Sequence, residues 1–188
     1  MTYILNIEGE PIFDDRIVKI ESHTYNPYDN TTLGYSDEIR IPMQQQDLYT
    51  LPCVSYLYAE GKIIAQATAE NVAVTLENNC VAFMFDEIRY ELDGVEIDHN
   101  RNVRITSTVK NYVSLSSYKI VGMKNAAWDT INAHSTDGYF NFCVPFSMLL
   151  GFCEDCRRIV INARHELILI RSRSDNNGLR GSLTLEPK

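Results

Sequence analysis

The sequence lacks most of the short motifs by which enzymes bind and transform substrates. It contains no Gly-x-x-x-x-Gly-Lys-Ser/Thr phosphate loop, no Gly-x-Gly-x-x-Gly fingerprint and no Gly-x-Ser-x-Gly nucleophile elbow. His165-Glu166 also lacks the second histidine of a zincin helix. We therefore expect a protein that is not an enzyme, with no catalytic, metal-binding or cofactor-binding residues and no cofactor.

Long apolar runs are also missing. No stretch of 18 apolar residues exists, and the first eight residues, Met1–Glu8, lack the basic start and long apolar core of a signal peptide. This pattern predicts synthesis in the cytoplasm or nucleus and no membrane partner.

Basic residues are outnumbered: 17 Lys and Arg stand against 25 Asp and Glu, for a formal charge of −8. Direct nucleic-acid binding is not expected, because affinity for phosphate depends on clustered Lys and Arg. The charge is uneven, at −13 over residues 1–98 and +5 over residues 99–188. This split suits charge-complementary contact between neighbouring copies, although interleaved strands could equally mix the two halves on one surface.

The cysteines form no disulfide framework. Their number is odd and their spacing irregular, so reduced thiols are expected at Cys53, Cys80, Cys143, Cys153 and Cys156. Cys153-Glu-Asp-Cys156 has the spacing of a redox pair or half of a zinc site. A zinc site needs a second Cys or His pair, which is not evident, so two ordinary thiols in a turn are the favoured interpretation.

A β-hairpin over Phe85–Asp98 is the clearest local signal in the chain. Apolar and charged residues alternate with period two, and Asp93-Gly94 supplies a two-residue type I′ turn. This turn predicts a register that pairs Leu92 with Val95, Tyr90 with Ile97, Ile88 with His99, Arg89 with Asp98 and Glu91 with Glu96. The like-charged Glu91 and Glu96 are an unusual pair on one face.

Further extended segments recur at the spacing of about 8–12 residues that is typical of an all-β sandwich. A short helix is predicted over Arg104–Ser117, where apolar and small residues fall at helical intervals. The longest strand is expected at Ile159–Arg171, apolar on both faces and therefore central in its sheet. The other predicted strands are Tyr3–Ile7, Ile17–Ile20, Asp37–Pro42, Val54–Tyr58, Ile63–Thr68, Val72–Leu76, Val81–Phe85 and Tyr139–Val144.

The order of these signals resembles a known architecture. The hairpin Phe85–Asp98 is followed by a helix or loop, then by Asn141-Phe-Cys-Val-Pro-Phe-Ser-Met-Leu-Leu-Gly-Phe152 and by Ile159–Arg171. This order is similar to the first jelly roll of double jelly-roll major capsid proteins, found in nucleocytoplasmic large DNA viruses, virophages and Polinton-type elements. The segments 37–52 and 164–177 also resemble capsid-like proteins of virus-derived elements in animal genomes.

The resemblance implies an all-β fold. We expect a jelly-roll β-sandwich of two four-stranded antiparallel sheets, with one or two short helices in the loops. Residues 1–188 would form one jelly-roll domain, with an N-terminal arm and first strands at 1–30 and a C-terminal extension at 178–188. Because the family repeats the sandwich, we expect this sequence to be a truncated, split or separately encoded half, or a single jelly-roll relative.

Several polar groups could in principle bind a ligand. Glu91, Glu96, Asp98 and His99 could together coordinate a hard cation, but a solvated charged strand end explains them equally well. His165, on an apolar face, is more readily interpreted as a hydrogen-bonded core histidine than as a ligand.

Three tyrosines stand in a polar loop: Tyr25, Tyr28 and Tyr35. They could stack on a sugar or a base, but packing of the loop or of a neighbouring subunit is favoured.

The function implied is that of a structural capsid-type protein of the virion, or of an endogenous viral element. Its partners would be copies of itself or a second jelly-roll domain, arranged in a trimer, pentamer or hexamer-like ring. The alternative is a jelly-roll module that binds carbohydrate or another small ligand.

Overall fold

The computed structural model describes residues 17–28, 34–44, 48–63, 75–128, 138–157, 160–161, 163–174 and 176–180. Their strands are β1 (Glu38–Met43), β2 (Tyr49–Thr50), β3 (Tyr56–Lys62), β4 (Thr75–Leu76), β5 (Phe85–Leu92), β6 (Val95–Arg101), β7 (Tyr139–Pro145), β8 (Val160–Ile161), β9 (His165–Arg171) and β10 (Leu179–Arg180). The α-helices are α1 (Cys80–Phe83), α2 (Val103–Ser114), α3 (Ser117–Gly122), α4 (Phe146–Leu149) and α5 (Gly151–Asp155). Short 3-10 turns lie at η2 (Pro52–Val54), η3 (Lys124–Ala126) and η4 (Asn176–Gly178). None of the helices in these ranges is long and apolar enough to cross a membrane.

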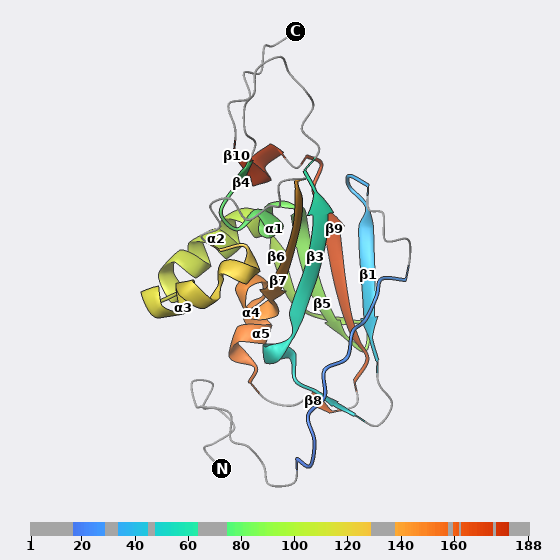
Figure 1. The fold of residues 1–188 in the computed structure, drawn as a ribbon. Coiled ribbons are helices and arrows are strands. Elements are labelled where there is room, and N and C mark those ends of the chain that lie inside the picture. The colour runs from blue at the N-terminus through green and yellow to red at the C-terminus, as the bar shows by residue number, and fades with distance from the viewer. Residues whose placement is uncertain are drawn as a thin grey trace.

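The largest sheet is antiparallel, with the strand order β1-β9-β5-β6 (Figure 1). Its central strand β9 pairs with β1 on one side and β5 on the other. Five successive residues of β9, His165 to Leu169, are buried, so both of its faces are covered. The predicted central position of this strand is confirmed.

The expectation of two four-stranded sheets is wrong for the described residues. Besides the four-stranded sheet they form three two-stranded pairs, β3 with β7, β2 with β8 and β4 with β10. The fold is still mostly β, but it contains five α-helices in the described ranges rather than the one or two expected.

Two segments account for part of this difference. Val81–Phe85, predicted as a strand, lies mostly in helix α1, because Asn79 takes a left-handed conformation (φ 60°) and turns the chain into a helical turn. A short apolar run has no period that separates a strand from a buried helix. The long strand predicted at Ile159–Arg171 is instead divided into β8 and β9.

The other strand predictions had mixed outcomes. Those for β1, β3 and β7 are confirmed to within a few residues, whereas Ile17–Ile20 belongs to no strand. Tyr3–Ile7 lies outside the described residues, as do most of Ile63–Thr68 and the first part of Val72–Leu76.

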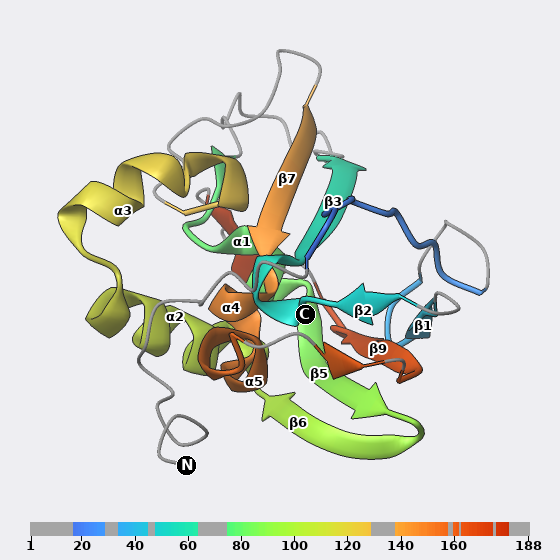
Figure 2. The same cartoon turned by 90° about the horizontal axis from the view of Figure 1, so that it is seen from below.

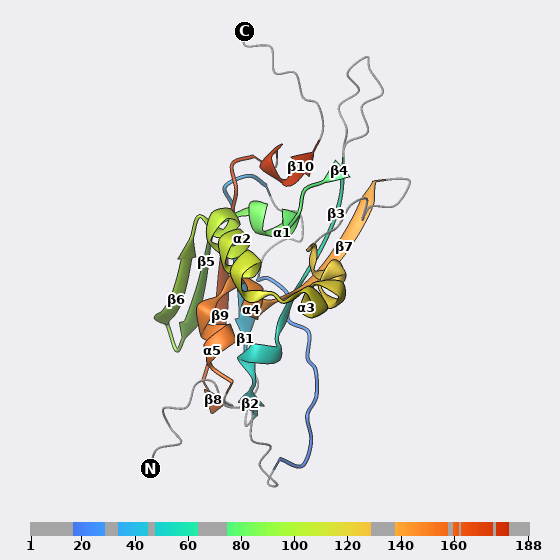
Figure 3. The same cartoon turned by 90° about the vertical axis from the view of Figure 1, so that its left-hand side faces the viewer.

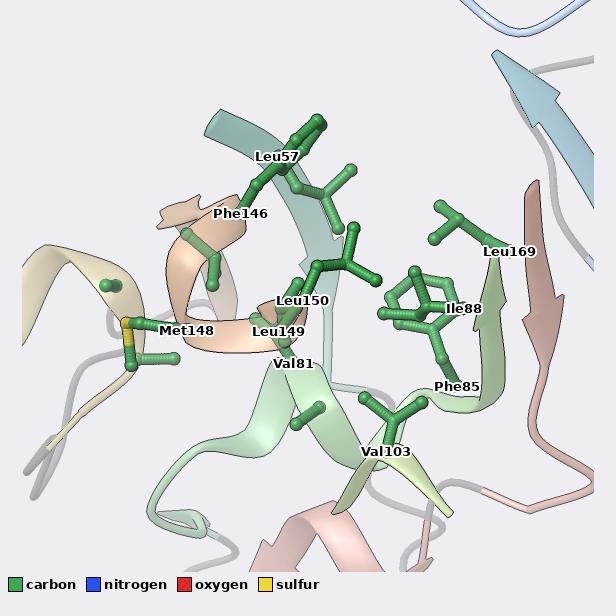
Figure 4. Close-up of a cluster of buried hydrophobic side chains, with 14 of the residues drawn as sticks. Leu57, Val81, Phe85, Ile88, Val103, Phe146, Met148, Leu149, Leu150 and Leu169 are labelled. Atoms are coloured by element: carbon green, nitrogen blue, oxygen red, sulfur yellow. The ribbon is translucent and has the colours of Figure 1, made fainter. Parts of the chain in front are cut away.

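The core lies between two layers, the four-stranded sheet and the β3–β7 pair (Figures 2 and 3). Helix α4 follows Pro145 and, with the residue after it, places Phe146, Leu149 and Leu150 in this core, toward Leu57 of β3 and Ile88 of β5 (Figure 4). The Pro145 that ends β7 therefore leads directly into the apolar turns that close the core.

The β5–β6 hairpin has the predicted turn but only part of the predicted register. Asp93 (φ 50°) and Gly94 (φ 79°) both adopt positive φ, as a type I′ turn requires. Leu92 faces Val95 and Glu91 faces Glu96, as expected. Beyond that point Tyr90 faces Asp98 rather than Ile97, so the predicted pairs of Tyr90, Ile88 and Arg89 are wrong.

The cause is a β-bulge at Ile97, an extra residue in the edge strand β6. One extra residue moves every following side chain to the opposite face. Asp98 and Asn100 therefore point to the core side, opposite the buried Tyr90 and Ile88.

Both inward side chains bind the helices that follow β7. Asp98 Oδ2 accepts the backbone N–H of Phe152, the second residue of α5, at 2.8 Å. Asn100 Nδ2 donates to the carbonyl oxygen of Leu149, at the end of α4, at 2.7 Å. The bulge thus converts the edge strand into a polar attachment for α4 and α5.

Replacing Asp98 by Ala should lower the free energy of unfolding by about 1–2 kcal/mol, because the Phe152 N–H loses a charged acceptor near a helix start. Urea denaturation measures the change. Glu96→Ala, on the exposed side of the same strand, is the matched control and should change stability by about 0.5 kcal/mol or less. Equal effects of the two substitutions would contradict the attachment role of Asp98.

Candidate interaction surfaces

Helix α2 confirms the helix predicted at Arg104–Ser117, but its apolar residues face solvent. Side chains that fall at helical intervals are 57% (Ile105), 59% (Val109), 67% (Tyr112) and 84% (Val113) exposed. A surface helix normally directs its apolar stripe to the core. In α2 this orientation is reversed.

The inward side of α2 carries the apolar Val103 and two buried polar residues that are hydrogen-bonded to the core. Ser107 and Asn111 are buried, and both contact the carbonyl oxygen of Met148, Ser107 Oγ at 3.0 Å and Asn111 Nδ2 at 3.3 Å. Asn79 Nδ2 donates to Ser107 Oγ at 3.2 Å and to Thr108 Oγ1 at 3.0 Å. Buried polar groups of this kind are costly to leave without partners, so the bonds fix the rotation of the helix.

Lys110 strengthens the same attachment. Its ammonium group donates to the carbonyl oxygens of Ser147 at 2.6 Å and Leu150 at 3.3 Å, and it forms an ion pair with Glu154 at 2.7 Å. The partners lie on or beside α4 and α5, so α2 contacts both short helices through one cation.

Helix α3 extends the exposed apolar area, with Tyr118 at 91% and Val121 at 70% exposure. Residues 101–127 carry five Lys and Arg and no Asp or Glu. We define the helical face as these exposed apolar residues and the cations beside them: Ile105, Val109, Tyr112, Val113, Tyr118, Val121, Arg104, Lys119 and Lys124.

A second exposed surface has the opposite charge. At the turn of the β5–β6 hairpin, Val95 (62% exposed) and Ile97 (43%) stand among carboxylates. We define the hairpin tip as Glu91, Asp93, Val95, Glu96 and Ile97. The bulge contributes to this surface, because its extra residue, Ile97, is exposed at the sheet edge.

The candidate cation site is not assembled. Asp98 lies on the core side and binds the Phe152 N–H, whereas His99 lies on the outer face. There His99 contacts Glu87 at 3.1 Å and Glu96 at 3.3 Å. Within the described ranges no group of three or more His, Cys, Asp or Glu could hold a metal ion.

Arg89 completes this outer cluster through its contact with Glu87 at 3.0 Å. Hydrogen bonds from Arg89 and then from His99 lower the pKa of the Glu87 carboxyl group. The region is therefore a charged strand face with an Arg89–Glu87 ion pair, which is the simpler of its two interpretations.

His165 is a core histidine, as expected. It is fully buried, and the hydroxyl of Tyr90 lies 2.6 Å from its Nδ1. Burial raises the pKa of Tyr90, so its O–H remains the donor, and burial lowers the pKa of His165. Its Nε2 has no hydrogen-bond partner among the described residues.

Three thiols lie near one another where η2 meets α5. Burial raises the pKa of Cys153 to about 12, with Asp98 and the thiols of Cys156 and Cys53 as further causes. Burial also raises the pKa of Cys53. All five cysteines are free thiols, as predicted, but Cys153 is a fully buried residue of helix α5 rather than part of a turn.

Within the described residues, Tyr25, Tyr28 and Tyr35 do not line a common pocket. Tyr28 and Tyr35 are exposed, and Tyr28 lies against the sheet edge, where its N–H donates to the Arg40 carbonyl at 3.0 Å and its hydroxyl accepts from Arg164 at 3.1 Å. Tyr25 is half-buried. Packing of the loop describes Tyr28 better than stacking on a ligand.

Sequence reasoning missed a different set of exposed aromatics on the β3–β7 pair. Tyr56, Tyr58 and Tyr139 are 58%, 60% and 57% exposed and share one face by their register. The alternation of Tyr56, Tyr58 and Glu60 was the signal that could have indicated this face.

A comparison with family models identifies the family to which this chain belongs. The model of the double jelly roll-like domain matches residues 74–188. The chain belongs to the double jelly roll-like domain family. The resemblance inferred from the order of the hairpin, the Pro145 strand and β9 is therefore confirmed, and the matched residues include both the helical face and the hairpin tip.

Solved structures similar to this double jelly roll-like protein include two of PBCV-1 proteins. One is titled as a quasi-atomic model of the PBCV-1 virus capsid, the other as PBCV-1 VP54 fitted into a cryo-EM reconstruction of the virophage Sputnik. Each has 11% identity and a TM-score of 0.43, over 84% of this chain and 38% of the other. This chain thus spans less than half the length of those proteins. No curated protein matches it.

The buried His165 predicts a pH-dependent stability. Its folded pKa is below the ordinary value of 6.5, so the unfolded chain takes up the proton first as the pH falls. Stability should be complete above about pH 6.5 and fall below it. His165→Gln should reduce this slope between pH 7 and 5 in urea titrations, with the exposed His23→Gln as the matched control. An unchanged slope in His165→Gln would contradict the assignment.

The cysteines of the Cys153–Cys156 pair should respond differently to replacement by Ser, because only Cys153 is fully buried. Cys153→Ser places a hydroxyl in the core and should cost about 1–3 kcal/mol, whereas the half-exposed Cys156→Ser should cost about 0.5 kcal/mol or less. Thermal unfolding compares them. The purified protein should contain no stoichiometric zinc by elemental analysis. One tightly held zinc per chain would contradict the interpretation as ordinary thiols.

Proposed function

We propose that this chain is a structural protein of the capsid type, a jelly-roll building block of a shell. The observation that carries the proposal is the double jelly roll-like family match over residues 74–188. Proteins of this architecture supply surfaces for association, so the functional residues are those of the helical face and the hairpin tip. No residue is assigned a catalytic role.

The proposed partners are copies of this chain or a second jelly-roll domain. Residues 1–188 would act as one jelly roll, with residues 1–30 as an arm and 178–188 as an extension. Head-to-tail contacts between such units close into a trimer, pentamer or hexamer-like ring when the rotation permits. The assembly would belong to a virion or to the product of an endogenous viral element, without direct contact to nucleic acid or membrane.

Two features of the described surface support association. Exposed apolar side chains gather on the helical face and again at the hairpin tip. Each set is bordered by charges of mainly one sign. Apolar patches with a charged border are typical of protein contact surfaces.

A ligand-binding module is the second candidate, and one observation favours it. The exposed Tyr56, Tyr58 and Tyr139 share a face with Glu60 and Lys62, and the Tyr58 hydroxyl bonds Glu60 at 2.9 Å. Flat aromatic rings beside polar groups can stack on a sugar. A monomeric protein that binds glycans through these residues would fit this function.

Sedimentation velocity from about 1 to 100 µM, at low and high salt, tests the capsid-type function. The purified chain should form rings or larger assemblies, and these should loosen as salt rises, because charges at a rim are screened over about 8 Å at physiological salt. A strict monomer at tens of micromolar in low salt would contradict self-association and favour the ligand-binding module.

A further inference from the structure

The two exposed surfaces complement each other in charge and chemistry. The helical face combines apolar side chains with Arg104, Lys119 and Lys124, and within the described part of the chain these three cations form no ion pair. The hairpin tip combines Val95 and Ile97 with carboxylates.

We propose that the helical face of one copy binds the hairpin tip of the next copy. The proposal rests on the capsid-type function and specifies the surfaces that would carry its self-association. Val95 and Ile97 would pack against the apolar residues of α2 and α3, while Glu91 and Glu96 approach the cations at the border.

The arrangement of the fold makes this contact intermolecular. Helix α3 and the turn of the β5–β6 hairpin lie on different sides of the molecule (Figure 2). The two surfaces of one chain therefore do not meet each other. Contact between different patches on identical chains is heterologous, and repeated contacts of this type build a ring or a filament.

The carboxylates at the tip are available for such a contact. Glu91 lies directly opposite Glu96, a like-charged pair that is destabilising unless a cation approaches. Glu91 itself has no ion pair among the described residues, whereas Glu96 contacts His99 at 3.3 Å and interacts electrostatically with Arg89. A cation from a neighbouring copy would relieve the repulsion between the two carboxylates.

The hydrogen bonds of α2 to the core hold its apolar residues in an outward orientation. Ser107, Lys110 and Asn111 are bonded to the core, so α2 cannot turn its apolar stripe inward without leaving buried polar groups unpaired. The face is thus held in place before any partner arrives, which lowers the entropic cost of binding.

An anionic lipid surface is the competing partner for a basic apolar helix. The second copy is favoured because the chain itself presents an acidic apolar surface of matching chemistry. Its overall charge of −8 also opposes approach to an anionic membrane.

Charge reversal with rescue tests the contact. Arg104→Glu with Lys119→Glu reverses the helical face, and Glu91→Lys with Glu96→Lys reverses the hairpin tip. Each double variant should weaken self-association in low salt at least about tenfold, because like charges then face each other. The quadruple variant carries both reversals, so opposite charges meet again, and its association should return to within about threefold of the wild type.

Lys19→Glu with Lys62→Glu is the control matched to reversal of the helical face, since it makes the same change in net charge at exposed residues outside both surfaces. Association in this variant should stay within about threefold of the wild type. Circular dichroism of every variant establishes that it is folded. All measurements use sedimentation velocity of the full chain, with a parallel flotation assay on phosphatidylserine vesicles.

The outcomes separate the two proposals. If the wild type assembles and neither charge reversal weakens its self-association, the proposed contact is wrong but the capsid-type function is not contradicted. A wild-type monomer would overturn both. Failure of the folded quadruple variant to recover would overturn the contact, as would vesicle binding that is lost on reversal of the helical face while assembly persists.

Discussion

The hydrogen bonds between α2 and the core determine which side chains of this molecule are exposed to a partner. Ser107 and Asn111 share the Met148 carbonyl, Asn79 bonds Ser107, and Lys110 reaches the end of α4. Because these groups are satisfied only with the polar side inward, the apolar side of α2 must face solvent. The stability of the monomer and the exposure of its apolar helix are therefore two consequences of the same contacts.

The bulge at Ile97, near the hairpin turn at the start of β6, likewise both stabilises the fold and shapes an exposed surface. It turns Asp98 and Asn100 inward, where they bind α5 and α4, and it leaves Ile97 exposed beside the acidic turn. A regular hairpin would have put Asp98 on the outer face with Arg89. A bulge also bends the edge strand and disrupts its free hydrogen-bonding groups, which opposes unspecific pairing of sheet edges. The edge thus offers side chains rather than backbone to a partner.

Local signals in the sequence were sufficient for some of this architecture. The Asp93-Gly94 turn, the doubly buried β9 and the period of α2 all follow from residues close together in the chain. The rotation of α2 does not, because it depends on Asn79 and Met148, which are distant in sequence. Nothing in the residue types of Val95–Arg101 indicates the bulge. The inward-pointing Asp98 and Asn100 form hydrogen bonds with backbone groups some 50 residues away in the sequence. Short apolar runs such as Cys80–Phe83 fit a helix or a strand, which is why α1 was mistaken for a strand.

Hydrogen–deuterium exchange as a function of protein concentration tests most directly whether the outward helical face is a contact surface. The account predicts that amides in residues 103–122 and 91–97 become more protected as the concentration rises through the range of assembly, whereas those of β3, Tyr56–Lys62, do not change. Assembly with unchanged exchange in α2, α3 and the hairpin tip, and new protection along β3, would contradict it.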